Sequence, residues 1–224
     1  MSLTLFYHPL ASFCWKVQIA LYENDTPFTS SIVNLGDQAS SAQFFALAPM
    51  GKMPALRDER RNRTVSETSI IIEYLDRHYP GQQRMLPPDA ELQLDARLWD
   101  RFFDLYVQVP MQKIVADHRR PAGEKDPAGV ADATATLRTA YDVLERQLST
   151  RTWAIGDEFS IADAAASPAL FYSSMVVPFA ETHPHLVQYF ERLVARDAFK
   201  RVIREAQPYF QYYPFRERIP ARFL

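Results

Sequence analysis

The sequence predicts a fold in two parts, a mixed α/β part at the N-terminal end followed by an all-helical part. Residues 3–34 show the pattern strand, helix, strand, which is typical of a βαβ unit with parallel strands. Residues 79–88, YPGQQRMLPP, contain three prolines and one glycine without hydrophobic periodicity, as expected of a connector. The segments beyond it have apolar residues at helical spacing. We therefore predict domains at 1–78 and 89–224, joined by a linker at 79–88.

The composition is that of an ordinary globular protein, and it narrows the function. The 224 residues are 47% hydrophobic and 23% charged, and a net charge of −2 lacks the basic excess expected of a nucleic-acid or anionic-membrane binder. No apolar run is long enough for a membrane span and the N-terminus is no signal peptide, so we expect a cytoplasmic protein. A single cysteine, Cys14, and five histidines without metal-ligand spacing predict neither a disulfide framework nor a metal site.

The stretch from Leu3 to Leu21 predicts a strand, a tight turn and a helix. Apolar and aromatic residues alternate up to Tyr7, Pro9 interrupts the strand, and Ser12 is expected to cap the helix. The helix is predicted to bury Phe13, Val17, Ala20 and Leu21, with Lys16 and Gln18 facing solvent. Exposed N–H groups at such a helix start favour a thiolate or carboxylate, although a βα turn of this kind is more often only structural.

The next segments predict the rest of a small sheet. We expect a strand at Phe28–Asn34 and a helix at Ser40–Leu47, and the next strand begins at Pro54. Arg57–Arg63 is expected to form the tip of a hairpin, and Thr64–Val65 its returning strand. Ser66–Ser69 then opens a helix that carries Ile70, Ile71, Tyr74 and Leu75 on one face and stops near Tyr79. The polar cluster at its start is a second candidate anion site, and plain capping explains it equally well.

The C-terminal part predicts a bundle. A long helix at Ala90–Asp117, kinked at Pro110, carries an apolar stripe of Leu94, Leu98, Phe102, Leu105 and Val109, whereas Phe103 and Tyr106 lie off it and face a second helix or a cleft. A loop at 118–129 precedes an amphipathic helix over 133–148. Ser160 and Asp163 have the form of a capping box before a buried, alanine-rich helix. Two more helices include Leu186–Leu193 and Phe199–Ala206, and the aromatic tail is expected to pack as an extended strap.

Four stretches in this order resemble the cytosolic glutathione S-transferase family, and the resemblance covers essentially the whole chain. They are YHPLASFCWKV, KMPAL, SETSIIIEYL and GDEFSIADAAA. The resemblance implies a thioredoxin-like N-terminal domain, an all-helical C-terminal domain, and glutathione as co-substrate.

The resemblance also assigns the glutathione-binding residues. It implies that Met53 offers its backbone to the cysteinyl part, ahead of a cis Pro54. Glu67 matches the residue that holds the γ-glutamyl ammonium. Thr68 matches the residue that holds the γ-glutamyl carboxylate, a position where Ser is commoner in the family. Lys52 is placed for the glycyl carboxylate, and a solvated surface lysine is the alternative.

The catalytic position departs from the family pattern. Zeta-, theta- and omega-like members have Ser or Cys where this chain has Ala11, and the hydroxyl appears one residue later, at Ser12. Tyr7 matches the strand-end tyrosine of the alpha, mu and pi classes. We favour Ser12 as the partner of the glutathione thiolate, keep Tyr7 as the alternative, and expect Cys14 to be buried and inert.

The resemblance leaves three functions open. The first is a transferase whose second substrate, an apolar electrophile, lies against Leu10, Phe103, Tyr106 and Met111, besides Tyr7. The second is a glutathione-dependent cis–trans isomerase, which the zeta-like SFCWKV favours. The third is a non-catalytic binding module, which Ala11 keeps open. A homodimer is implied, through Ala90–Asp117 and the edge near Arg63–Ser69.

Overall fold

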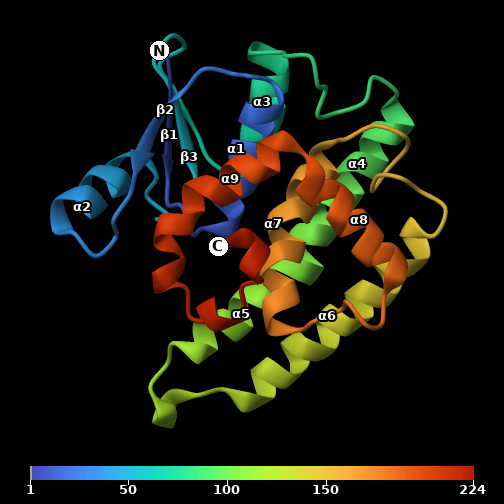
Figure 1. Cartoon of the computed structure of the whole chain (residues 1–224). Helices are drawn as coiled ribbons and strands as arrows, with labels where there is room; N and C mark the ends of the chain where they lie inside the picture. Colours follow the sequence, from blue (N-terminus) through green and yellow to red (C-terminus); the bar gives the residue numbers. More distant parts are fainter. Residues whose placement is uncertain (1) are drawn as a thin grey trace.

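The N-terminal part is a four-stranded mixed sheet with helices beside it (Figure 1). The structure is a computed structural model and describes residues 2–224. The strands are β1 Leu3–Tyr7, β2 Thr29–Ile32, β3 Ala55–Asp58 and β4 Arg63–Val65, in the order β2-β1-β3-β4. As predicted, β1 and β2 are parallel; β3 is antiparallel to both β1 and β4. The helices are α1 Ser12–Glu23, α2 Gln38–Leu47 and α3 Thr68–His78.

The sheet agrees with the prediction in outline and differs at its edges. Strand β2 is shorter than the predicted Phe28–Asn34, and β3 continues to Asp58, so the hairpin tip is only 59–62. Asp58 is fully buried because its carboxylate accepts hydrogen bonds from the hydroxyls of Tyr74 (2.7 Å) and Tyr79 (2.6 Å). A charged residue within a charge-dense segment therefore belongs to the core, where two phenols satisfy it.

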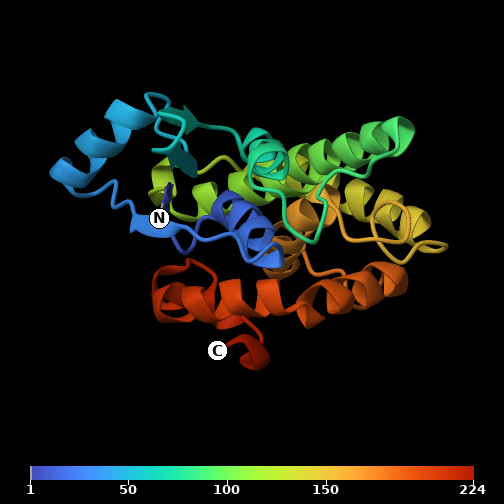
Figure 2. The same cartoon turned by 90° about the horizontal axis from the view of Figure 1, so that it is seen from above.

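The C-terminal part is a bundle built around α7 Ile161–Val176. Its other helices are α4 Ala90–Phe102, a π-helix at Phe103–Gln108, α5 Val109–His118, α6 Pro127–Leu148, α8 Pro184–Ala195 and α9 Asp197–Ala206. Figure 2 shows α4 and α9 on opposite sides of α1. The predicted capping box is present: the Ser160 N–H donates to the Asp163 carboxylate (2.9 Å), and the alanine-rich α7 is buried along most of its length. No helix or strand lies within 79–88, and we propose that stretch as the domain boundary.

The prediction for α1 was wrong at Lys16 and Gln18. Both side chains are buried, with 1% exposure each, because the C-terminal helices cover the face expected to meet solvent. The Lys16 ammonium lies 2.6 Å from Asp100 and 2.8 Å from Asp104, and it donates to the Ser69 hydroxyl (3.0 Å). We call these four residues the Lys16 cluster; it joins α1 and α3 to α4 and the π-helix. The N-cap of α1 is Ala11 and not Ser12.

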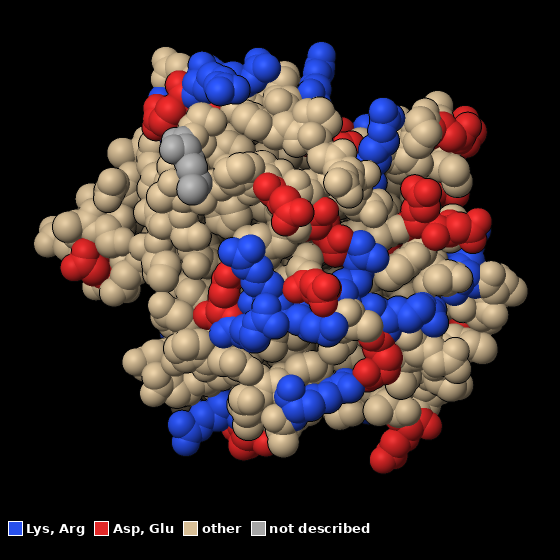
Figure 3. Space-filling view, turned by 45° about the horizontal axis from the view of Figure 1, so that its top comes forward, with Lys and Arg blue, Asp and Glu red and all other residues tan. Residues whose placement is uncertain are grey.

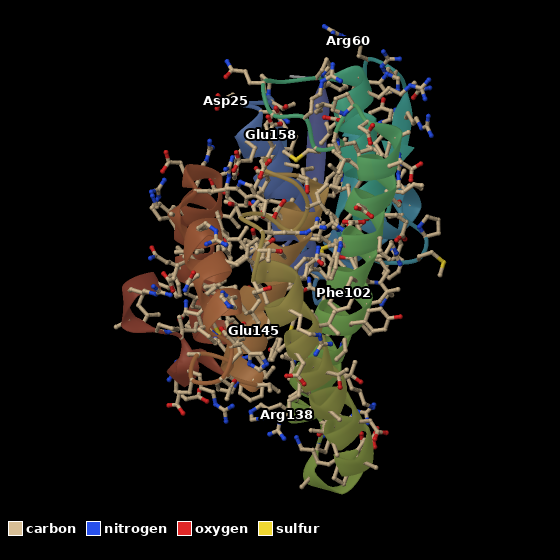
Figure 4. All side chains as sticks on the ribbon, turned by 90° about the vertical axis from the view of Figure 1, so that its right-hand side faces the viewer. Asp25, Arg60, Phe102, Arg138, Glu145 and Glu158 are labelled. Carbon is tan, nitrogen blue, oxygen red and sulfur yellow. The ribbon has the colours of Figure 1, made fainter. Side chains whose placement is uncertain are left out.

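The apolar stripe predicted for the long helix was also wrong. Leu94 and Leu98 are each 60% exposed, Leu105 and Val109 are close to half exposed, and the buried face carries Ala96 and Phe103 instead. Figure 4 labels Phe102 on the same helical stretch, on the side of the molecule away from α8 and α9. The stretch is thus turned so that its leucines point outward.

The tail packs over the body as predicted, but it is not extended. Short 3₁₀ helices form at Gln207–Tyr212, Arg216–Arg218 and Ala221–Phe223. Phe210 and Phe223 lie against Phe171 of α7, with ring centroids 6.1 Å and 5.2 Å apart. The chain therefore ends against α7 of the bundle.

Charged side chains of both signs occur over the face drawn in Figure 3. Several form ion pairs across elements, among them Arg196 with Glu23 and Arg222 with Glu191. Among residues 2–224, no helix combines the length and apolar character needed to cross a membrane.

Candidate functional site

Two adjoining cavities lie between the N-terminal and C-terminal parts. The first, which we call the Glu67 cavity, has a volume of about 430 Å³ and lies between the start of α3 and the π-helix. The second, which we call the Ser12 cavity, has a volume of about 440 Å³ and lies between the start of α1, helix α5 and the tail. Met53 and Gln112 line both cavities, so the two cavities share part of their wall.

The Glu67 cavity contains every residue that the sequence predicts for glutathione. Its lining includes Lys52, Met53, Pro54, Glu67 and Thr68. These residues come from the β3 entry and the α3 start, which are separated in sequence and meet because β3 and β4 bring the chain back beside α1. The Met53–Pro54 peptide bond is cis, as predicted.

The polar groups of the Glu67 cavity are of both signs. Glu67 is the N-cap of α3 with φ at 66°, in the left-handed region, and its side chain is exposed. Thr68 is buried at the first turn, where backbone N–H groups lack partners within the helix. Lys52 is exposed at the rim. The Glu67 cavity therefore presents a carboxylate, a helix start and an ammonium on one wall system.

Sequence reasoning missed Arg101 and Asp104, which also line the Glu67 cavity. Their charged groups lie 3.8 Å apart, and burial raises the pKa of the Asp104 carboxyl. No motif marks them, because they belong to a π-helix junction whose orientation depends on the Lys16 cluster.

Ser12 lies at the border of the two cavities. Its hydroxyl is 4% exposed, lines the Ser12 cavity, and accepts a hydrogen bond from the Gln112 side-chain amide at 3.4 Å. Because Gln112 is the donor in that contact, the Ser12 O–H stays available to donate. Ser12 is the first residue of α1, so the positive end of the helix dipole adds to its field.

The structure separates Tyr7 from this site. Tyr7 is 6% exposed at the end of β1 and lines neither cavity, and burial raises the pKa of its phenol. Cys14 is fully buried as predicted, and burial raises the pKa of its thiol to about 12. Neither side chain is placed to meet a bound sulfur.

The residues predicted for the second substrate are only partly brought together. Leu10 and Met111 line the Ser12 cavity. Phe103 is fully buried in the bundle, stacked on Tyr189 at 6.4 Å, and Tyr106 is half exposed; neither lines a cavity of the site. Tyr172, Tyr212 and Tyr213 provide the aromatic wall instead. Helical spacing could not reveal them, because Tyr172 belongs to the central helix and the other two to the irregular tail.

The fold is of the class in which a thioredoxin-like sheet domain is followed by a helical bundle domain, here with cavities lined by both parts. The sequence models of the glutathione S-transferase N-terminal domain and C-terminal domain match residues 5–83 and 102–197. The chain belongs to the glutathione S-transferase family, whose co-substrate is glutathione.

Individual relatives are distant but nearly full-length. The glutathione S-transferase GstB of Escherichia coli K12 is 25% identical over 84% of this chain and 91% of its own. The maleylacetoacetate isomerase maiA of Aspergillus fumigatus is 27% identical over 92% of both chains. A glutathione S-transferase from Methylobacterium radiotolerans, solved with glutathione sulfonate, is 26% identical, with a TM-score of 0.76 over 89% of this chain and 93% of its own. One from Methylobacillus flagellatus, solved with glutathione bound, superposes with a TM-score of 0.82 over 90% and 98% of the two chains at 24% identity.

Proposed function

We propose that this protein is a glutathione transferase that binds glutathione in the Glu67 cavity and directs its sulfur toward Ser12. The observation that carries the proposal is the convergence of Lys52, Met53, Pro54, Glu67 and Thr68 on one cavity that shares a wall with the Ser12 cavity. Glu67 then pairs with the γ-glutamyl ammonium, Thr68 and its helix start hold the adjoining carboxylate, and Lys52 pairs with the glycyl carboxylate.

Ser12 is the residue we assign to the sulfur. A free thiol has a pKa of about 8.5, so little thiolate exists at neutral pH. A hydrogen bond from Ser12 to the sulfur and the α1 start together favour the thiolate; lowering its pKa by about two units corresponds to about 2.7 kcal/mol. The thiolate attacks an electrophilic carbon, an S–C bond forms, and the leaving group departs with its electron pair.

The first test combines binding and turnover. We expect immobilised glutathione to retain the protein and free glutathione to elute it, and the eluted protein to conjugate 1-chloro-2,4-dinitrobenzene. Retention without turnover of aryl halides would instead favour a specialised reaction. Absence of retention would favour the non-catalytic binding module, and it would remove the proposed role of Glu67 and Thr68.

The second test identifies the thiolate partner. Ser12→Ala is expected to lower kcat/KM about 10- to 100-fold, since a hydrogen bond to a charged group contributes about 1.5–3 kcal/mol. The same change should raise the pKa of bound glutathione, read from the thiolate absorbance near 240 nm. Tyr7→Phe is the control, and we expect it to change neither value. The assignment is wrong if Tyr7→Phe alone lowers the rate.

A glutathione-dependent cis–trans isomerase is the second candidate. The match to maiA over 92% of both chains favours it, and the same thiolate would serve by adding reversibly to a conjugated double bond. A cis-configured conjugated alkene assayed with catalytic amounts of glutathione separates the two functions. An isomerase returns the glutathione, whereas a transferase consumes it.

We also propose that two copies of the chain associate through the exposed side of α4. Leu94 and Leu98, one turn apart, are each 60% exposed, and Ile70 of α3 is 51% exposed. Exposed aliphatic residues grouped on neighbouring helices are typical of a protein interface. As working proposals, the second substrate is an electrophile with an apolar body, and the protein acts in the cytoplasm.

A further inference from the structure

The Ser12 cavity holds an unpaired positive charge. Arg119, which follows α5, is the only Lys or Arg among the described residues that line this cavity, and no Asp or Glu lines it. Its guanidinium forms no ion pair or hydrogen bond with any residue from 2 to 224 within the usual distances. Arg120, by contrast, reaches the Asp117 carboxylate (3.9 Å) and the Glu124 carbonyl (3.4 Å).

The capping of α5 does not require Arg119 in particular. A cation near a helix C-terminus is favourable because of the helix dipole, and Arg120 supplies that charge as well. What distinguishes Arg119 from Arg120 is its position on the cavity. Its charge is thus available to a bound molecule.

A second group on the same cavity lacks a partner. Tyr213 of the tail is 6% exposed, and its buried hydroxyl has no hydrogen-bond partner among the described residues. Its ring packs edge-on against Tyr172, with centroids 5.2 Å apart, and the Tyr172 hydroxyl is already engaged with the Leu10 carbonyl (3.1 Å). Buried hydroxyls without partners are uncommon. This one belongs to a residue that lines the cavity, and it meets an acceptor on a ligand once the Tyr213 side chain turns toward the cavity.

The imidazole of His8, which also lines the cavity, is neutral. The Leu10 N–H donates to Nδ1 of His8 (3.2 Å), which leaves the proton of the imidazole on Nε2, and burial lowers the pKa of His8. Apart from Ser12 and Gln112, the rest of the wall is apolar or aromatic, including Met111, Val115 and Tyr172. The cavity of about 440 Å³ therefore combines an apolar surface with one cation and hydrogen-bond donors.

We propose that the second substrate is an apolar, aryl-sized electrophile that carries a carboxylate, with Arg119 pairing with the carboxylate and the Tyr213 hydroxyl donating to it. This inference deepens the proposed function and rests on it, since the electrophile must lie beside a glutathione sulfur near Ser12. It narrows the substrate from apolar molecules in general to apolar acids. Arg119 and Tyr213 determine specificity, and the residues that hold glutathione lie in the other cavity.

The test compares two aryl halides that differ in charge, 1-chloro-2,4-dinitrobenzene and 4-chloro-3-nitrobenzoate. Arg119→Gln is expected to raise KM for the benzoate about 10- to 100-fold, as for loss of a charge-assisted contact, and to leave the neutral substrate within about twofold. Tyr213→Phe should raise KM for the benzoate about three- to tenfold. Arg120 is one residue away and outside the cavity, so Arg120→Gln should leave the KM for both substrates unchanged.

A binding measurement keeps the inference testable without turnover. Calorimetry with 4-methyl-3-nitrobenzoate, which has no leaving group, should show binding to the glutathione-loaded wild-type protein and to Arg120→Gln, with at least tenfold weaker binding to Arg119→Gln. Binding of the benzoate with this pattern, but no conjugation of either halide, would overturn the proposed reaction and support the acid site. Equal losses for both halides, or equal binding of the benzoate to all three proteins, would overturn the inference.

Discussion

At the scale of single residues, the structure shows that the same residue type has different roles according to its surroundings. Ser12, expected as a cap, is instead the first residue of α1 with its hydroxyl on a cavity. Tyr7, expected as an alternative catalytic group, is core. Cys14 lies two residues from Ser12 on the same helix and is fully buried. Sequence position alone does not separate these roles, because one helical turn faces both a cavity and the core.

Cys14 gives a direct test of that difference. With a thiol pKa of about 12, the native protein at pH 8 holds only about one part in ten thousand of the Cys14 side chain as thiolate. We expect no reaction with Ellman's reagent over minutes at pH 8, and release of one equivalent per chain in concentrated urea. Because the folded-state pKa is raised, reactivity should increase only at strongly alkaline pH or on unfolding. Rapid labelling of the native protein would contradict the burial of Cys14.

At the scale of elements, the sequence predicted helices and strands better than it predicted which way they face. The buried positions of α6, from Ala133 to Leu148, and the capping box of α7 are as expected, since each is a local pattern. The long helix is turned the other way, because Asp100 and Asp104 are buried against Lys16 of another element. Periodicity counts such residues as polar, so it cannot detect a buried ion pair that forms only after folding.

The Lys16 cluster makes a stability prediction at this scale. Lys16→Met removes the ammonium and leaves two carboxylates buried together, so the free energy of unfolding should fall by about 3–5 kcal/mol. Lys113→Met is the matched control, because the ion pair of Lys113 with Asp126 is partly exposed and should contribute much less to the free energy of unfolding. Urea denaturation followed by far-UV circular dichroism measures both. Similar losses in the two variants would mean that the cluster does not hold α1 to α4.

For the candidate site, sequence reasoning found the glutathione half better than the other half. Lys52 to Pro54 and Glu67–Thr68 are two short contiguous motifs, and both line the Glu67 cavity. The Ser12 cavity is assembled from α1, α5, α7 and the tail, so no local pattern encloses it. Arg119 lies in a stretch whose composition suggested only a loop, and its role depends on what the fold places opposite it.

At the scale of the whole molecule, the outward leucines of α4 have a consequence for assembly. The double variant Leu94→Glu, Leu98→Glu is expected to behave as a single chain of 25.8 kDa in sedimentation equilibrium, whereas the wild-type protein should have twice that mass. Buried carboxylates without partners would oppose the interface. Met50→Glu is the control, because Met50 is 83% exposed but lies outside α4. A wild-type protein that sediments as one chain would refute the dimer.

The two cavities are lined mostly by different parts of the chain. The tail residues Tyr212, Tyr213 and Pro214 line the Ser12 cavity. Among the described residues, no tail residue lines the Glu67 cavity. Under the proposed function, substitutions at residues 212–214 are expected to change which electrophile is accepted without changing the residues proposed to bind glutathione. A change of substrate selectivity would therefore require substitutions in only a short segment of the chain.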